Sequence, residues 1–250
     1  MPFGQDGDYS EQAMLACANG FLANALGNLQ MRVLSLIFKN CGGAMPHPCR
    51  PGSDDSSNEE QSTEYSNLEL TMDDEALLQE ARCLRDRMTP LMSTQQLHKA
   101  CGCIDACVRS ANKYIDEQAP WALKKTDTVR MATTLWVLAE TLRHVAICAS
   151  PFMPSASKAM LDQLAVPVDQ RSLQHLTLPR DAAEDISPST AETLAALSFA
   201  IEPGTPITKP VGIFPRIELD DAAGSDVGNA GGKASPKNKK KKKEGKTAAA

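Results

Sequence analysis

Three side chains in this sequence have the chemistry and spacing to bind an unpaired nucleobase. The first two, Asn28 and Arg32, lie four residues apart in a segment with helical periodicity, so both fall on one helix face beside the apolar stripe. An amide and a guanidinium placed in this way can hydrogen-bond base edges or hold a phosphate. The same pair can also form the solvated flank of an amphipathic helix, and spacing alone favours that interpretation.

The third side chain, Trp121, follows Pro120 at the end of a long helical pattern. Proline cannot continue that helix but suits the first turn of a new one. Trp121 is therefore expected at a helix junction, where a large ring can stay partly exposed and stack on a base. Burial of the ring between helices is the alternative, and position alone favours it.

Other reactive side chains are weaker candidates. Cys101, Cys103 and Cys107 are spaced closely enough to resemble a metal cluster. Cys101 falls on the predicted apolar stripe, Cys103 does not, and no paired CxxC follows, so we predict no metal site. His98 and His144 lie on predicted helices without a positioned Ser or Cys partner, which favours structural roles. We therefore predict no catalytic residue.

The elements that must position these side chains are helices. Aromatic residues make up only 4% of the chain, so aliphatic side chains must fill the core, which favours helices. Four segments carry apolar residues at helical spacing, and a shorter fifth helix follows them. We predict an all-α bundle of about five helices over these segments: 15–36, ended by Gly42, Gly43 and Pro46, then 77–91, 97–115, 131–149 and 154–164.

The sequence predicts one helical domain over residues 1–219 and a disordered, lysine-rich tail over residues 220–250. Within the domain, residues 48–67 are acidic and serine-rich and should form a mobile loop, and a short helix is predicted for residues 188–197. Residues 203–217 contain four prolines and two glycines, so they should form an extended segment.

Charge is distributed unevenly along the chain. The net charge is −5, but residues 233–246 hold eight lysines and one glutamate, so the rest of the chain carries −12. Nucleic acid would have to bind through a local patch or through this tail. The tail can act as a nuclear signal, as an RNA-binding segment or as a solubilising segment, and its composition favours the last, with some non-specific affinity for RNA.

No run of eighteen apolar residues and no secretory signal occur, so we expect an intracellular protein with reduced cysteines and no membrane partner. There is also no glycine-rich phosphate loop and no nucleotide-binding signature.

Several motifs in one order resemble the C-terminal, anticodon-binding domain of bacterial and organellar methionyl-tRNA synthetases. The resemblance covers about residues 1–45 and 70–219. It rests on FGQDGDYS (3–10), LANALGNLQMRVLSLI (22–37), ANKYIDEQAPW (111–121), WVLAETLR (136–143), SPFMP (150–154), GTPITKP (204–210) and IFPR (213–216).

This resemblance implies a helical bundle that grips the CAU anticodon of initiator and elongator methionine tRNAs. It implies that Trp121 stacks on the first anticodon base while Asn28 and Arg32 hydrogen-bond base edges. The family attaches methionine to tRNA with ATP, but its catalytic domain, where ATP, methionine and the zinc knuckle belong, would precede Met1. We therefore expect this chain alone to be inactive and to hold no cofactor.

The departures from the family pattern leave alternatives open. The acidic loop is longer than is usual in the family, and the lysine tail stands where some members carry an extra tRNA-binding domain. A partial gene product is one expectation, with a catalytic domain supplied upstream or in trans, in the cytoplasm or in an organelle such as a mitochondrion or plastid. The rival interpretations are a helical interaction module, a general RNA-binding module and a non-functional gene fragment.

Overall fold

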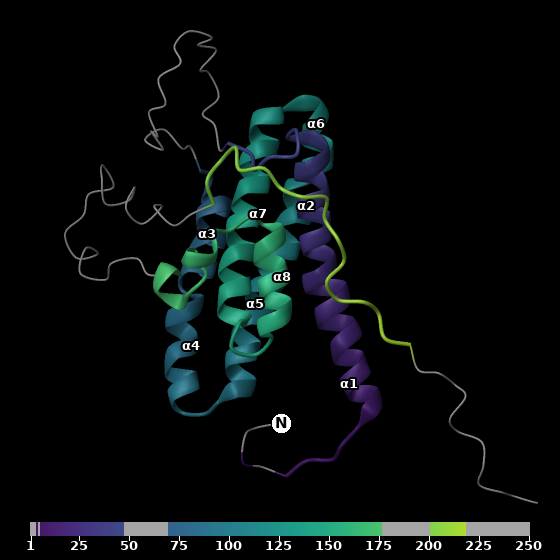
Figure 1. The fold of residues 1–250 in the computed structure, drawn as a ribbon, viewed down its shortest axis with the longest axis vertical. Helices are drawn as coiled ribbons and strands as arrows, with labels where there is room; N and C mark the ends of the chain where they lie inside the picture. The colour runs from purple at the N-terminus through teal and green to yellow at the C-terminus, as the bar shows by residue number, and fades with distance from the viewer. Residues whose placement is uncertain (1–3, 5, 48–69, 177–200, 219–250) are drawn as a thin grey trace, which may run out of the picture. The chain divides into compact units, whose positions relative to one another are not determined.

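The computed structural model describes residues 4, 6–47, 70–176 and 201–218. The predicted acidic loop (48–67), short helix (188–197) and basic tail (220–250) lie outside these described residues. Within them, the protein is a bundle of helices, and the β-pairing consists of one antiparallel bridge between Ala44 and Pro206 (Figure 1).

The five helices expected from the sequence are confirmed. The first is one continuous helix, Glu11–Asn40, whose middle third is a π-helix. The second is divided at Cys83, and the new helix expected to start at Pro120 is α6. Across the described residues the elements are α1 (Glu11–Cys17), η1 (Ala18–Gly27), α2 (Asn28–Asn40), α3 (Met72–Arg82), α4 (Leu84–Ser93), α5 (Leu97–Gln118), α6 (Pro120–Thr126), α7 (Thr128–Ala149), α8 (Pro154–Gln163) and the 3-10 turns η2 (Val168–Gln170) and η3 (Leu173–Leu176).

Local sequence signals begin these helices. Thr71 caps α3 in a reciprocal capping box with Asp74, and the Asp127 carboxylate caps α7 by accepting from the Arg130 amide. Pro120 and Pro154 occupy the first turns of α6 and α8, where a missing N–H costs nothing. The helix boundaries near the candidate site therefore follow from side chains next to each boundary.

α7 lies at the centre of the bundle and packs against α2, α3, α5, α6 and α8 (Figure 1). The sequence predicts a narrow apolar stripe on this helix, but every residue from Thr133 to Ala149 is buried. Helices surround α7, so its polar residues are buried together with its apolar ones. The central helix thus holds the buried ionic group formed by Glu140, Arg143 and His144.

The predicted stripe on α5 is shifted at its beginning. Cys101, assigned to the stripe, is exposed, whereas Cys103 is partly buried against the core and Cys107 is fully buried. The buried face of α5 runs through Ala100, Ile104 and Cys107, and Cys101 lies at the edge of this face, where it is exposed. The placement of Cys101 on the apolar stripe was therefore wrong.

The helix Glu11–Asn40 is buried only in its second half. α1 has no buried residue, whereas Leu26, Leu29 and Val33 are fully buried. By length and composition this helix could also cross a membrane, but core helices of soluble proteins pass the same test, so this is weak evidence. The absence of a membrane partner therefore stays a prediction.

Candidate nucleic-acid interface

Two of the three predicted site residues, Arg32 and Trp121, are in contact. The guanidinium carbon of Arg32 lies over the indole ring of Trp121, 5.3 Å from its centroid. Arg32 Nη2 also donates a hydrogen bond of 2.7 Å to Asp116 Oδ1. The guanidinium is therefore held between a carboxylate on α5 and an aromatic ring on α6.

The indole of Trp121 faces solvent at a sharp corner between α5 and α6. Trp121 is 46% exposed, whereas its neighbour Pro120 is buried. Ala119, between the two helices, has a left-handed backbone (φ 43°, ψ 59°), a conformation that costs a non-glycine residue about 1–2 kcal/mol. Burial of Trp121, which its position alone favoured, is wrong because Pro120 fills the interior position at this corner.

The third predicted residue, Asn28, is the first residue of α2 and is exposed. It lies one turn before Arg32, so the two side chains share one helix face. In the described part of the chain its side-chain amide has no hydrogen-bond partner, unlike the Arg32 guanidinium. This amide is therefore available to a ligand.

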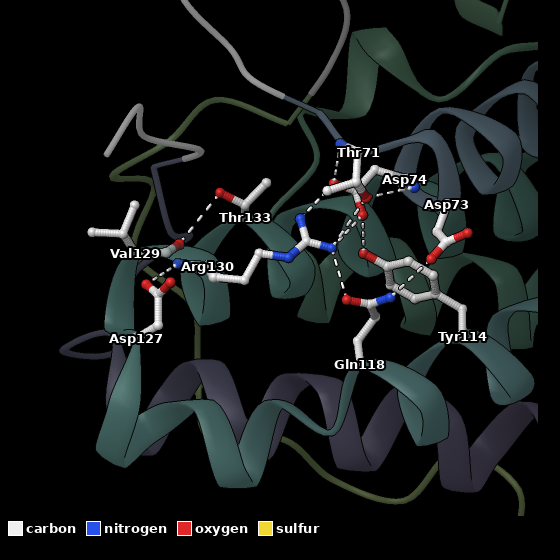
Figure 2. Close-up of polar contacts among 9 residues, drawn as sticks. All are labelled: Thr71, Asp73, Asp74, Tyr114, Gln118, Asp127, Val129, Arg130 and Thr133. Carbon is white, nitrogen blue, oxygen red and sulfur yellow. Dashed lines mark hydrogen bonds and ion pairs between the residues drawn. The ribbon is translucent and has the colours of Figure 1, made fainter. Parts of the chain in front are cut away.

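A buried polar network holds the α5–α6 corner in place (Figure 2). Arg130 of α7 donates to both carboxylate oxygens of Asp74 on α3, with 2.8 Å between Nη2 and Oδ1, and Tyr114 of α5 donates to the same Oδ1. Arg130 Nη2 also donates to Gln118 Oε1 at 2.8 Å, and Gln118 is the last residue of α5. Three helices are therefore joined directly beside the residue that turns the chain toward Trp121.

Hydrogen bonds and charge keep the Asp74 carboxylate of this network ionised. Burial by itself would raise the pKa of Asp74, but the hydrogen bonds from Arg130 and Tyr114 outweigh burial and lower it. Burial and the hydrogen bond to Asp74 raise the pKa of the Tyr114 hydroxyl. The hydroxyl therefore stays protonated and acts as the hydrogen-bond donor to Asp74. The α5–α6 corner is therefore stabilised by a charged carboxylate, Asp74, whose two oxygens both accept hydrogen bonds.

Positive charge lies next to the indole. Lys124 and Lys125 follow Trp121 by three and four residues on α6, so they share a face with it, and both are exposed. Neither forms an ion pair within the described ranges, whereas Lys113 on α5 lies 3.7 Å from Glu117. An acidic domain thus carries a local basic patch beside an exposed aromatic ring, a combination suited to single-stranded nucleic acid.

A family model described as the anticodon binding domain of methionyl tRNA ligase matches residues 66–232. The chain belongs to this family. Trp121 lies within the matched residues, whereas Asn28 and Arg32 precede them.

Relatives extend the similarity to the first helix. The methionine–tRNA ligase of Mesorhizobium japonicum is 38% identical over 216 residues, which cover 86% of this chain and 34% of the relative. That of Rhizobium meliloti is 39% identical over 220 residues, covering 88% and 35%. The crystal structure of apo Mycobacterium tuberculosis methionyl-tRNA synthetase superimposes with a TM-score of 0.69 at 32% identity, covering 88% of this chain and 37% of that one. The chain thus spans about a third of the length of these bacterial relatives.

Sequence reasoning missed several residues that shape the site of this anticodon-binding domain. Lys124 and Lys125 could have been found from their spacing to Trp121. Asp116 is part of a recognised motif, but nothing local indicates that it binds Arg32. The ion pair between Arg130 and Asp74 joins α7 to α3, and no local pattern in the sequence predicts it.

The cysteines of α5 differ in their surroundings. Burial raises the pKa of Cys107 to about 12, so this thiol stays protonated at neutral pH. Cys101 is exposed, and the described residues contain no cluster of three or more His, Cys, Asp or Glu side chains suited to a metal.

Proposed function

We propose that this chain binds the anticodon loop of methionine tRNA and reads its CAU sequence. The observation that carries the proposal is the exposed Trp121 ring with Arg32 stacked on it. Asn28, which is exposed, lies one helical turn before Arg32. Bases in an anticodon loop are accessible on their faces and edges, so stacking and edge hydrogen bonds can act together.

The contact between Arg32 and Trp121 indicates how a base would bind. A guanidinium is flat and about as thick as a nucleobase, and in the free protein it occupies the ring face that a base would take. When a base stacks on the indole, Arg32 can slide aside while Asp116 holds it, and it can then donate to the base edge. Arg32 would thus exchange a stacking role for a hydrogen-bonding role.

The basic patch supports binding of the loop backbone. Lys124 and Lys125 are exposed beside Trp121 and can contact phosphates, which position RNA without reading its sequence. Sequence discrimination would then come from Trp121, Asn28 and Arg32, and affinity in part from the lysines.

The relatives are methionine–tRNA ligases, and this chain matches about a third of their length. We propose that it presents tRNA to a catalytic portion that binds ATP and methionine, whether joined to it or acting in trans. Incubated with ATP, methionine and tRNA, this chain alone should yield no charged tRNA. Charging by the purified chain would overturn this assignment.

The direct test is binding of RNA hairpins that carry CAU or altered anticodons in the loop. Trp121→Ala should weaken CAU binding by about 1–3 kcal/mol, the usual value of one base–aromatic stack. Tyr9→Ala is the matched control, because Tyr9 is an exposed aromatic residue outside the site. Equal affinity for every anticodon, or equal effects of the two substitutions, would contradict the proposal.

A general RNA-binding function is the second candidate, and the eight lysines between residues 233 and 246 favour it. Removing residues 220–250 separates the two functions. Loss of all RNA binding on removal of the tail, with no effect of Trp121→Ala in the full chain, would establish the general function instead.

A further inference from the structure

The segment of residues 201–217, here called the C-terminal strap, is held to the bundle at three places by side chains. At the first, Trp136 Nε1 donates to the carbonyl oxygen of Ile201, and the Ile201 amide donates to Glu140 Oε2, at 3.2 and 3.1 Å. In Figure 1 the strap (yellow-green) crosses the bundle from this point and then runs beside the N-terminal helix.

The other two attachments lie on either side of Phe214. Gln163 of α8 donates to the carbonyl of Val211 at 2.9 Å and accepts from its amide at 3.1 Å. Asn19 of η1 makes the same pair of bonds to Ile217, both at 2.9 Å. Each side-chain amide acts as a strand partner would and satisfies both backbone groups of one residue. The position of Phe214 along the bundle is therefore closely defined.

Phe214 lies against Gly27, the last residue of the π-helix η1. A Cβ atom at Gly27 would be 3.3 Å from Phe214 Cδ2 and 3.0 Å from the carbonyl oxygen of Leu22. Both distances are tighter than ordinary contacts, so any larger residue here would require Phe214 or the helical turn to shift by a few tenths of an ångström.

Asn28 follows Gly27 directly and closes the π-helix. Its backbone N–H donates to the carbonyl of Ala23, five residues earlier, which is the hydrogen bond that defines a π-turn. The chain returns to α-helical geometry at this residue. Because π-helices are unfavourable by themselves and persist where packing supports them, the orientation of Asn28 depends on what packs against η1.

We propose that Phe214 is a positioning residue for Asn28. It packs over Gly27, holds the last turn of η1 in π geometry and so directs the Asn28 side-chain amide toward the face that it shares with Arg32. This inference rests on the proposed reading of the anticodon by Asn28, and it makes the strap part of the specificity apparatus rather than a terminal segment that only covers the core.

A double-mutant cycle tests this role in the full chain, with the affinity for a CAU hairpin as the readout. Asn28→Ala and Phe214→Ala should each weaken binding several-fold, and the double variant should be no weaker than the poorer single variant. The deviation from additivity should be at least about twofold, as for residues that act through one another. Phe214→Leu, which refills most of the space, should restore most of the affinity.

The control cycle pairs Phe214→Ala with Trp121→Ala, whose effects should add because Phe214 acts on Asn28 and not on Trp121. If Phe214→Ala does not fold, as judged by its melting transition, Gly27→Ala disturbs the same contact from the other side and should show the same non-additivity with Asn28→Ala. If Asn28→Ala weakens binding but the losses of affinity for Phe214→Ala and Asn28→Ala are additive, the inference about Phe214 is wrong and the proposed base reading still stands. No effect of Asn28→Ala itself would overturn the proposed base reading.

Discussion

Arg32 stacks its guanidinium on the indole of Trp121 while Asp116 binds the same guanidinium. The stacking surface is therefore occupied in the free protein by a side chain that can also hydrogen-bond bases. Binding of a base would replace a cation–π contact with base stacking, and the ion pair with Asp116 keeps Arg32 close during this exchange.

Arg32→Lys separates charge from shape at this position. Lysine keeps the positive charge but loses the flat, forked donor group, so CAU binding should weaken by about 1–3 kcal/mol in hairpin titrations. The salt dependence of binding should stay close to that of the unaltered protein, because the charge is unchanged. Affinity equal to that of the unaltered protein would mean that Arg32 contributes charge only.

Replacing Lys124 and Lys125 together by Ala should change the salt dependence of binding and leave the preference for CAU unchanged, the reverse of the result expected for Arg32→Lys. Affinity for all anticodons should fall alike, and the slope of log affinity against log salt should shrink by about 0.7 for each phosphate that the protein no longer neutralises. Lys158→Ala is the control, because Lys158 is exposed on α8 and is paired with Asp162. A change in preference between anticodons would show instead that these lysines read bases.

Arg130→Met tests the network below the α5–α6 corner. Asp74 is fully buried, so losing its cation leaves an unpaired charge, and the free energy of unfolding should fall by about 3 kcal/mol in urea titrations. Arg109→Met removes an exposed ion pair with Asp105 and should cost less than about 0.5 kcal/mol. Equal decreases for the two variants would show that the network adds no stability beyond that of a surface pair.

The buried ionic group on α7 predicts lower stability in acid. Burial lowers the pKa of His144 from 6.5 to about 4. Burial would raise the pKa of Glu140, but the charge and hydrogen bonds of Arg143 outweigh it and set this pKa at about 2, below the usual 4.5. Both groups bind protons more readily in the unfolded chain, so stability falls as the pH drops, first from 6.5 to about 4 and then from 4.5 to about 2.

Urea titrations at pH 7 and pH 5 isolate the His144 contribution. The unaltered protein should lose about 2 kcal/mol of stability between these values through this residue. His144→Asn should remove most of that decrease, whereas His98→Asn, at an exposed position, should keep it. The same decrease in both variants would assign the acid sensitivity to other groups.

The helices could be predicted from the amino-acid sequence because their signals are local. Apolar residues at helical spacing predicted α5 and α7, a shorter helix was predicted where α8 lies, and Pro120 predicted the junction before Trp121. The recognised motifs also indicated the family, and the match over residues 66–232 confirmed it.

The contacts between side chains of different helices could not be predicted in this way, because they depend on how the helices pack. The stacking of Arg32 on Trp121, the pairing of Arg130 with Asp74 and the approach of Phe214 to Gly27 each join separate helices or segments. The exposure of Trp121 likewise depends on how the helices pack. The periodicity of apolar residues indicates which face of a helix is apolar, but it does not indicate which other helix packs against that face. The burial of every residue from Thr133 to Ala149 on α7 and the exposure of Cys101 depend on those neighbours, since burial is a property of the packed bundle rather than of any one segment.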